Sequence, residues 1–228
     1  MFIRQLPLWL AQTNCWIISR SKDDLECILV DVPPSPDEII DTLRSHDLKP
    51  VAILATHGHI DHVGGIATIA RTKLLAETAG QLPVYINNAD KHLLLDPVGT
   101  SGALGQELLD SGIDVTPPEL IYDLEDGDVF KGSGLVFETL HTPGHTEGSL
   151  CFLARDADSS ERVLFSGDHL FKGSIGRTDL PGGSYAKLVE SMKSRILPLD
   201  DALIVLPGHG GSTTIGVEKS SNPFLLNM

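Results

Sequence analysis

Long hydrophobic runs are absent from this chain of 228 residues. No segment approaches the roughly 20 consecutive apolar residues that a membrane-spanning helix needs. The apolar stretch LPLWLA at residues 6–11 is too short for the hydrophobic region of a secretory signal, and no small-residue cleavage site follows it. We therefore expect no membrane partner, an N-terminal segment that belongs to the fold, and a cytoplasmic protein.

Cysteine is scarce as well. Cys15, Cys27 and Cys151 each stand alone in an apolar stretch, and the sequence contains no C-x-x-C pair. An odd number of isolated cysteines cannot form a complete disulfide framework. We interpret them as three buried, small hydrophobic residues in a reducing compartment.

Basic residues are few compared with acidic ones. The chain has 17 Lys and Arg against 31 Asp and Glu, which gives a formal net charge of −14. Nucleic acids and anionic membranes require a basic face, so this balance argues against both as partners. A small-molecule partner remains compatible, because bound divalent metal ions can dominate the local field.

Short apolar strands alternate with helical stretches along residues 1–228, which we interpret as one domain. No glycine-rich phosphate loop follows a strand. This alternation favours two sandwiched sheets flanked by helices, an α/β fold, over a doubly wound sheet. Strands are predicted at about 2–7, 14–20, 26–31, 50–56, 84–87, 135–141, 148–155, 162–166 and 202–206.

Helix signals are clearest at two places. Ser35 as N-cap, Pro36 in the first turn and Glu38 as the partner of a capping box predict a helix after residue 35. Ser184 is the predicted cap of a helix over 184–196. A further helix is expected over 64–79, whereas residues 95–118 carry no clear pattern.

The stretch ATHGHIDHVGG, residues 55–65, crowds three histidines and one aspartate into six positions. His57 and His59 are two apart in an extended segment, so their side chains point the same way and can hold one ion. Asp61 and His62 follow the turn and can face a second ion. The alternative is a chance cluster on a solvated loop.

Three more ligand-type residues follow apolar strands and lie beside glycines: His145, Asp168 and His209. A catalytic zinc site uses about three protein ligands plus water. Five histidines and two aspartates exceed that number and suit two ions that share a bridge. We expect two divalent ions, with zinc favoured and iron or manganese possible on the same donors.

The order H-x-H-x-D-H at 57–62, then His145, Asp168 and His209, resembles the metallo-β-lactamase superfamily over almost the whole chain. The resemblance implies a four-layer αβ/βα sandwich with the metals at one edge. It also implies that Asp61 and Asp168 are catalytic as well as ligating. The implied ligands are His57, His59 and His145 for the first metal, Asp61, His62 and His209 for the second, and Asp168 as the bridge.

Within that superfamily, GDHLFKGSIGRTDLPGGS at 167–184 and PGHGGSTTIGVEKSSNPFL at 207–225 are most similar to short, single-domain glyoxalase II-like hydrolases. This likeness implies cleavage of thioesters of the hydroxyacylglutathione type by a hydroxide shared between two metals. A thioester suits such a site because its leaving thiolate, with a thiol pKa near 8.5, departs without a strong general acid.

Three cations are candidates for binding an anionic substrate. Arg177 lies in the loop GSIGRTDLPGG after Asp168, where it could bind a substrate carboxylate or form a structural pair with Asp179. Lys172 and Lys219 could also reach a substrate, or could be ordinary surface lysines.

Other functions are compatible with parts of the pattern. A persulfide dioxygenase with one iron also carries a GRTD loop, present here at 176–179, although such relatives commonly place a cysteine where this chain has Ile175. A lactonase is a further hydrolase candidate. A β-lactam hydrolase is disfavoured by the intact Asp61, and a lapsed, non-enzymatic site by the complete ligand set.

Overall fold

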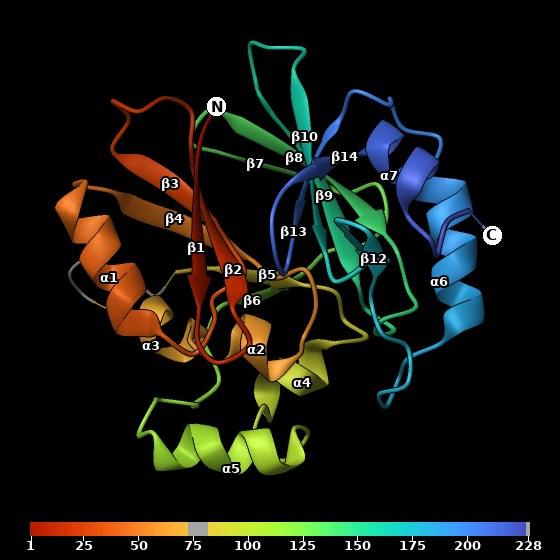
Figure 1. Ribbon diagram of the computed structural model, residues 1–228. Coiled ribbons are helices and arrows are strands. Elements are labelled where there is room, and N and C mark those ends of the chain that lie inside the picture. Colours follow the sequence, from red (N-terminus) through yellow and green to blue (C-terminus); the bar gives the residue numbers. More distant parts are fainter. Residues whose placement is uncertain (73–81, 227–228) are drawn as a thin grey trace.

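The computed structural model describes residues 1–72 and 82–226, and two β-sheets form its centre (Figure 1). The first sheet has the strand order β1 (Phe2–Leu8), β2 (Thr13–Ser19), β3 (Glu26–Val30), β4 (Lys49–Leu54), β5 (Val84–Ile86) and β6 (Ile121–Asp123). The second has the order β14 (Thr213–Thr214), β13 (Ile204–Pro207), β10 (Arg162–Gly167), β9 (Leu150–Asp156), β8 (Leu135–His141) and β7 (Val129–Gly132). A small hairpin, β11 (Leu170–Phe171) and β12 (Ser174–Ile175), follows β10.

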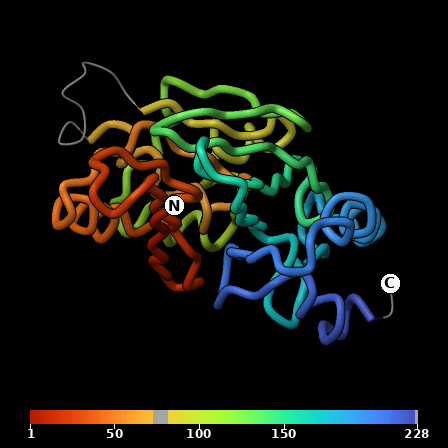
Figure 2. Tube along the Cα trace, turned by 90° about the horizontal axis from the view of Figure 1, so that it is seen from above, coloured from red at the N-terminus to blue at the C-terminus, as the bar shows by residue number. Residues whose placement is uncertain are grey.

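Helices cover the outer face of each sheet. On the first sheet, α1 (Pro36–Ser45) and α3 (Ile66–Arg71) bury Ile39 and Ile66 in one cluster with Ile17 of β2. On the second, α6 (Tyr185–Ser191), the π-helix η2 (Met192–Ile196) and α7 (Ile215–Ser221) bury Leu188 in a cluster with Val205 of β13. Figure 2 shows the N-terminal half on one side of the molecule and the C-terminal helices on the other. The predicted four-layer sandwich is confirmed.

The alternation of side chains along each strand produces these layers. On β2, Trp16 and Ile18 belong to the cluster between the sheets, where they meet Phe165 of the second sheet. Cys15 and Ile17 point the other way, toward α1 and α3. Because successive side chains of a strand face opposite sides, a strand buried on both faces reads as a continuous apolar run. All three cysteines are buried and free, as predicted.

Parallel strands bring the carboxyl ends of both sheets to one edge of the sandwich. In the first sheet β3, β4, β5 and β6 are parallel neighbours. In the second sheet β10 is parallel to β13, and β8 runs in the same direction because both pair antiparallel with β9. Loops that follow β4, β8, β10 and β13 therefore meet at this edge.

Two local predictions were wrong. The helix expected over 64–79 begins earlier, as α2 (Ile60–Val63), and restarts as α3 after Gly64 and Gly65; residues 73–81 lie outside the described part. Ser35 is the N-cap of α1 but its side chain makes no cap hydrogen bond, so the capping box is not formed. Ser184 does cap α6, by accepting from the Lys187 N–H.

The sequence analysis did not delimit two helices near the ligand edge. They are α4 (Lys91–Leu95) and α5 (Gly102–Asp110), and Figure 1 shows α5 on the outside of the molecule below α4. Within the described ranges, no helix combines the length and the hydropathy that crossing a bilayer requires.

Candidate metal centre

Seven candidate ligands from both sheets gather at the carboxyl edge of the strands. The loop after β4 and the short helix α2 supply four of them, the β8–β9 loop supplies one, and the turns after β10 and β13 supply one each. The seven side chains are His57, His59, Asp61, His62, His145, Asp168 and His209.

Their ligand atoms form overlapping groups in which all atoms lie within 4.8 Å of one another. His57, His59 and His145 form one group, and Asp61, His62 and His209 form another; Asp168 forms a third with His57 and His62. The Asp168 Oδ1 atom is 3.2 Å from His62 Nε2, and its Oδ2 atom is 3.4 Å from His209 Nε2 and 3.6 Å from His145 Nε2. The Asp168 carboxylate therefore lies between the two histidine groups.

Fixed acceptors orient four of the five imidazoles. A carbonyl or carboxylate oxygen can only accept, so the ring nitrogen facing it carries the proton and the other nitrogen presents its lone pair. Thr56 Oγ1 already donates to Asp31, so it too accepts from the ring beside it. The four Nδ1 contacts are His57 to Thr56 Oγ1 at 3.1 Å, His62 to Asp31 Oδ2 at 2.8 Å, His145 to the Arg177 carbonyl at 2.8 Å, and His209 to the Ala11 carbonyl at 3.1 Å.

Burial and mutual repulsion keep two histidines of the first group, His57 and His59, neutral. Burial, followed by the charges of the neighbouring imidazoles, lowers the pKa of His57 well below its usual value. The same causes lower the pKa of His59 to about 4. Neutral imidazole is the form that binds a metal ion, so His57 and His59 are ready donors near neutral pH.

In the second group, the carboxylates of Asp61 and Asp168 determine the direction in which the histidine pKa shifts. Burial lowers the pKa of His209, but hydrogen bonds to Asp168 and Asp61 outweigh it and raise that pKa to about 9. Burial acts to raise the pKa of Asp168, yet the charge of His62 and hydrogen bonds from His209 and His62 hold it well below its usual value. The two carboxylates favour positive charge at this place, and a divalent cation can take over that role from the imidazole protons.

The space around Asp168 also fits bound cations. Its Oδ1 atom is buried and makes no well-aligned hydrogen bond within the described residues, although His62 Nε2 lies 3.2 Å away. A Cβ atom on Gly208 would lie 2.3 Å from that oxygen and 2.6 Å from His62 Cε1. Glycine at 208 therefore keeps open the space that the convergent ligand atoms face. Imidazole and carboxylate donors suit zinc, iron and manganese.

Asp31 is a functional candidate that the sequence analysis missed. It follows β3 directly, is 1% exposed, and has a left-handed backbone with φ of 57°. It accepts from the N–H and hydroxyl of Thr56, both at 2.8 Å, and from His62 Nδ1 at 2.8 Å. A carboxylate that accepts from the far nitrogen of a ligand histidine fixes the orientation of the ring. Its position after the apolar run CILV was the available signal.

Asp90, at the N-terminus of α4, is a second residue that was missed. Its buried carboxylate accepts from the Gly58 N–H at 2.9 Å, the Thr146 hydroxyl at 2.6 Å and the Gly148 N–H at 2.8 Å. Gly58 lies between two ligands and Thr146 follows a third. Asp90 therefore connects the two loops that carry the first histidine group.

Replacement of Asp90 by alanine is expected to lower the free energy of unfolding by about 3 kcal/mol, because three buried donors lose their acceptor. Denaturant unfolding of the metal-free protein measures this, and metal titration should show weaker binding by the first group. Asp41→Ala, at an exposed position on α1, is the matched control. Equal stability of the Asp90 and Asp41 variants would contradict the connecting role.

A cavity of about 620 Å³ opens onto the ligands. His59, Asp61, His145, Asp168 and His209 line its floor. The remaining wall is mostly apolar and comes from the β1–β2 turn, from α4 and α5, and from the loop after Arg177. A ligand in this cavity can reach atoms of both histidine groups.

The three predicted substrate-binding cations have different positions. Arg177 lines the cavity and at the same time forms a two-pronged pair with Asp179, at 2.8 and 2.7 Å. Lys172 lies exposed at the turn of the β11–β12 hairpin, and it does not line the cavity. Lys219 donates to Asp201 at 2.6 Å and likewise lies outside the cavity lining, so its position does not support substrate contact there.

His169, next to Asp168, is 1% exposed, and neither ring nitrogen has a hydrogen-bond partner among the described residues. Burial, followed by the charge of His145, lowers its pKa to about 3. His141 is the last residue of β8 and donates to the Glu147 carbonyl at 2.9 Å, which is a structural contact.

Comparison with known proteins gives consistent matches. The model of the metallo-beta-lactamase superfamily matches residues 8–209. The hydroxyacylglutathione hydrolase GloC of Haemophilus influenzae is 36% identical, covering 99% of this chain and 98% of that protein. The crystal structure of BLEG-1 B3 metallo-beta-lactamase is 36% identical with a TM-score of 0.82, covering 98% and 99% of the two chains. The crystal structure of TTHA1623 in a di-iron-bound form is 33% identical with a TM-score of 0.76, covering 99% and 100%.

Proposed function

The chain belongs to the metallo-β-lactamase superfamily, and from that membership we propose that it is a binuclear metal-dependent hydrolase of thioesters of the hydroxyacylglutathione type. Members of the superfamily are generally metal-dependent hydrolases. The observation that carries the proposal is the complete second group, Asp61, His62 and His209, which lies beside the first and is joined to it by Asp168. The likeness to GloC supports the thioester class.

The chain's own residues would hold two metals as the sequence predicted. His57, His59 and His145 would hold the first, Asp61, His62 and His209 would hold the second, and Asp168 would contribute to both. Divalent ions bound there acidify water and polarise a carbonyl oxygen. We propose zinc as the metal, and iron is a strong alternative because one solved relative is in a di-iron form.

The protein would position the substrate rather than supply a strong acid. In the reaction, the C–S bond of the thioester breaks and a C–O bond forms with the oxygen of water. One water proton ends on the departing sulfur and the other leaves with the acid product. Because a thiol has a pKa near 8.5, its thiolate can leave before it is protonated. Asp61 is held in place by the Thr13 hydroxyl at 2.9 Å, and His145 by the Arg177 carbonyl.

β-Lactam hydrolysis is a second candidate, favoured by the likeness to BLEG-1. The same ligands and cavity could accommodate attack on a strained amide. An amine leaving group requires a proton, however, and the cavity lining within the described residues has Arg177 as its one long cationic side chain, already paired with Asp179. This difference makes the thioester the better supported substrate.

Thiol release from lactoylglutathione tests the proposal. We expect release that is lost after chelation and restored by zinc, iron or manganese, with no oxygen uptake on glutathione persulfide. Opening of a chromogenic β-lactam is measured in parallel. Oxygen uptake by protein with one iron, or β-lactam opening without thiol release, would overturn the thioesterase assignment.

Arg177→Ala is expected to raise KM for glutathione thioesters by about two- to fivefold with little change in kcat, since an exposed cation contributes uniform binding. Asp179→Asn frees Arg177 from its pair and should lower KM. Lys219→Ala, which removes a cation outside the cavity, is the matched control. Unchanged KM in the Arg177 and Asp179 variants would return Arg177 to a structural role.

A further inference from the structure

The cavity above the ligands has an apolar rim contributed by four separate segments: the β1–β2 turn, α4, α5 and the loop after Arg177. We define the apolar rim as Trp9, Leu10, Leu93, Leu104, Leu180 and Pro181. Leu10 is 68% exposed and Leu104 is 46% exposed. Large apolar side chains exposed beside a polar site are typical of a surface that a ligand covers.

The first segment, the β1–β2 turn, is attached to the ligands themselves. The Ala11 carbonyl accepts from His209 Nδ1 at 3.1 Å, and the Thr13 hydroxyl donates to Asp61 at 2.9 Å. Trp9 has a φ of 60°, a left-handed conformation that is unfavourable for a bulky residue. Because Ala11 and Thr13, which follow Trp9 and Leu10 closely, contact the second ligand group, Trp9 and Leu10 are held next to that group.

The second segment is equally close to the first ligand group. Leu93 of α4 packs against the loop that carries His57 and His59, since a Cβ atom on Gly58 would lie 2.6 Å from the Leu93 Cβ. Leu104 extends this wall from α5. The rim therefore borders both ligand groups and not one of them alone.

The charges around the rim disfavour an anion. No residue of the rim is charged, and Arg177, the neighbouring cation, is paired with Asp179. The cavity floor carries the carboxylates of Asp61 and Asp168. A hydrocarbon group is thus the chemical class that this wall accommodates best, because burying apolar surface is favourable and needs no hydrogen-bond partner.

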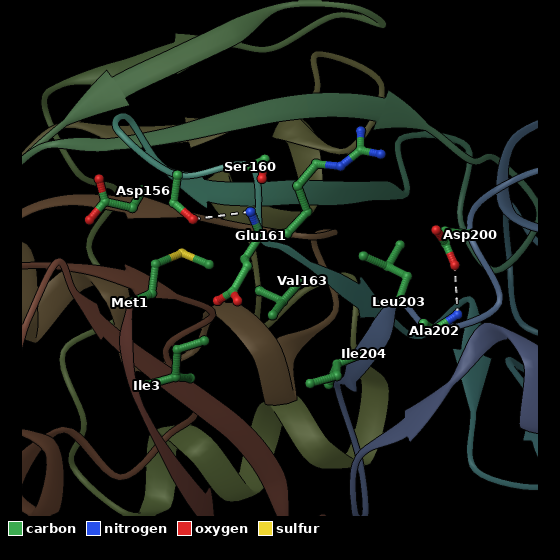
Figure 3. A pocket seen from close by; sticks show the side chains of 12 residues that line it. Met1, Ile3, Asp156, Ser160, Glu161, Val163, Asp200, Ala202, Leu203 and Ile204 are labelled. Atoms are coloured by element: carbon green, nitrogen blue, oxygen red, sulfur yellow. Dashed lines mark hydrogen bonds between the residues drawn. The ribbon is translucent and has the colours of Figure 1, made fainter.

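A second cavity, of about 730 Å³, is the alternative place for a hydrocarbon group. Figure 3 shows Met1, Ile3 and Val163 on its wall. Ile3 lies near the start of β1 and Trp9 follows its end, so at about 3.3 Å per residue the two cavities are about 20 Å apart. That cavity lies too far from the ligands to hold the acyl group of a thioester that reacts there.

We propose that the apolar rim binds the acyl group, and that the preferred substrates are thioesters with an unbranched hydrocarbon acyl chain rather than a small hydroxyacyl group. This inference rests on the proposed thioesterase function and specifies the acyl part of its substrate. The scissile carbonyl lies over the ligands while the chain extends along Leu93 and Leu104 or along Trp9 and Leu10.

A series of thioesters that share glutathione as the thiol and differ in the acyl chain tests whether the rim binds that chain. For acetyl, butyryl, pentanoyl and hexanoyl thioesters, kcat/KM is expected to rise about fourfold for each methylene that enters the rim. Glutaryl thioester has the length of the pentanoyl compound but ends in a carboxylate, and it should react at least tenfold more slowly. If kcat/KM stays constant or falls as the acyl chain lengthens, and lactoylglutathione is cleaved best, the rim does not bind the acyl chain. That result would leave the proposed thioesterase function intact.

Two variants of the same helix separate the rim from general effects on α5. Leu104→Ser is expected to reduce the hexanoyl-to-acetyl ratio of kcat/KM about tenfold. Leu109 is 45% exposed on α5 and does not line the cavity, so Leu109→Ser should keep the wild-type ratio. Equal ratios in the two variants would contradict the assignment of Leu104.

A binding measurement keeps the inference testable if no thioester is cleaved. S-(2-oxoheptyl)glutathione and S-(2-oxopropyl)glutathione are non-hydrolysable ketones that differ in hydrocarbon length. The longer ketone is expected to bind at least tenfold more tightly and to change the fluorescence of Trp9, with Trp9→Phe removing the signal. Tighter binding of the longer ketone, without release of thiol from any thioester, would support hydrocarbon binding by the rim and refute the thioesterase function. Equal binding of the two ketones would refute hydrocarbon binding by the rim.

Discussion

Asp168→Ala is expected to lower thiol release by about a thousandfold or more and to reduce the metal retained by the protein at the same time. Asp168 is the carboxylate whose oxygens lie 3.2 Å from His62 Nε2, 3.4 Å from His209 Nε2 and 3.6 Å from His145 Nε2. Its loss removes a ligand from both groups and leaves their imidazoles to repel one another. Each 1.4 kcal/mol lost from transition-state stabilisation is a tenfold loss of rate, and metal ions supply several kcal/mol of it.

Elemental analysis and steady-state kinetics on the same preparation measure this effect. Asp41→Ala, exposed on α1, is the matched control and should keep both metal and activity. A folded Asp168 variant that retains two ions, or one that turns over substrate at near wild-type rate, would contradict the bridging role.

Asp31→Ala is expected to produce the second large effect, on stability and metal affinity together. The variant leaves His62 Nδ1 and the two donors of Thr56 buried without an acceptor, which corresponds to about 3 to 5 kcal/mol of unfolding free energy. It also places alanine in a left-handed conformation, since φ at this position is 57°. Free rotation of the His62 ring should weaken the second metal by about ten- to a hundredfold.

Asp31→Asn separates orientation of the ring from stability. Asparagine tolerates a left-handed backbone and keeps one acceptor oxygen for Thr56, so the stability loss should be smaller, while metal affinity still falls. Thermal unfolding of the metal-free protein and competitive titration with a metal indicator measure the two quantities. Unchanged metal affinity in both Asp31 variants would show that Asp31 serves the fold alone.

The convergence of the seven candidate ligands was predictable because sequence spacing and strand ends coincide. His57 and His59 share one face of an extended segment, and Asp168 and His209 each follow an apolar run and a glycine. Parallel strands then carry residues that are 152 positions apart, such as His57 and His209, to the same edge. The layers were predictable as well, because strands buried on both faces read as continuous apolar runs.

The supporting residues were not predictable from spacing. Asp31 and Asp90 are isolated acidic residues in the sequence, and what distinguishes them is the donors that converge on each carboxylate after folding. The same limit applies to the rim, since Leu10, Leu93 and Leu104 come from segments that the sequence does not relate. In addition, Gly64 and Gly65 end α2 before α3 begins, which a single helical pattern over 64–79 did not anticipate.

Helix-forming signals also depend on tertiary context. Ser35 has the residue type of an N-cap, but its φ of −139° and ψ of 56° leave the side chain without a cap hydrogen bond. Ser184 has the same residue type, and an extended backbone lets it accept from Lys187 N–H. Residue identity therefore located the start of both helices, while the hydrogen bonds depended on how the preceding loops pack.

Metal stoichiometry tests the central claim, that one edge of the sandwich holds two ions on seven ligands. Protein reconstituted with zinc, or with iron under anaerobic conditions, is freed of excess metal and analysed for ions per chain, beside His209→Ala. We predict two ions in the wild-type chain and one in the variant, which keeps His57, His59 and His145. One ion in both proteins would contradict this prediction, and would leave Asp61, His62 and His209 without a metal to hold.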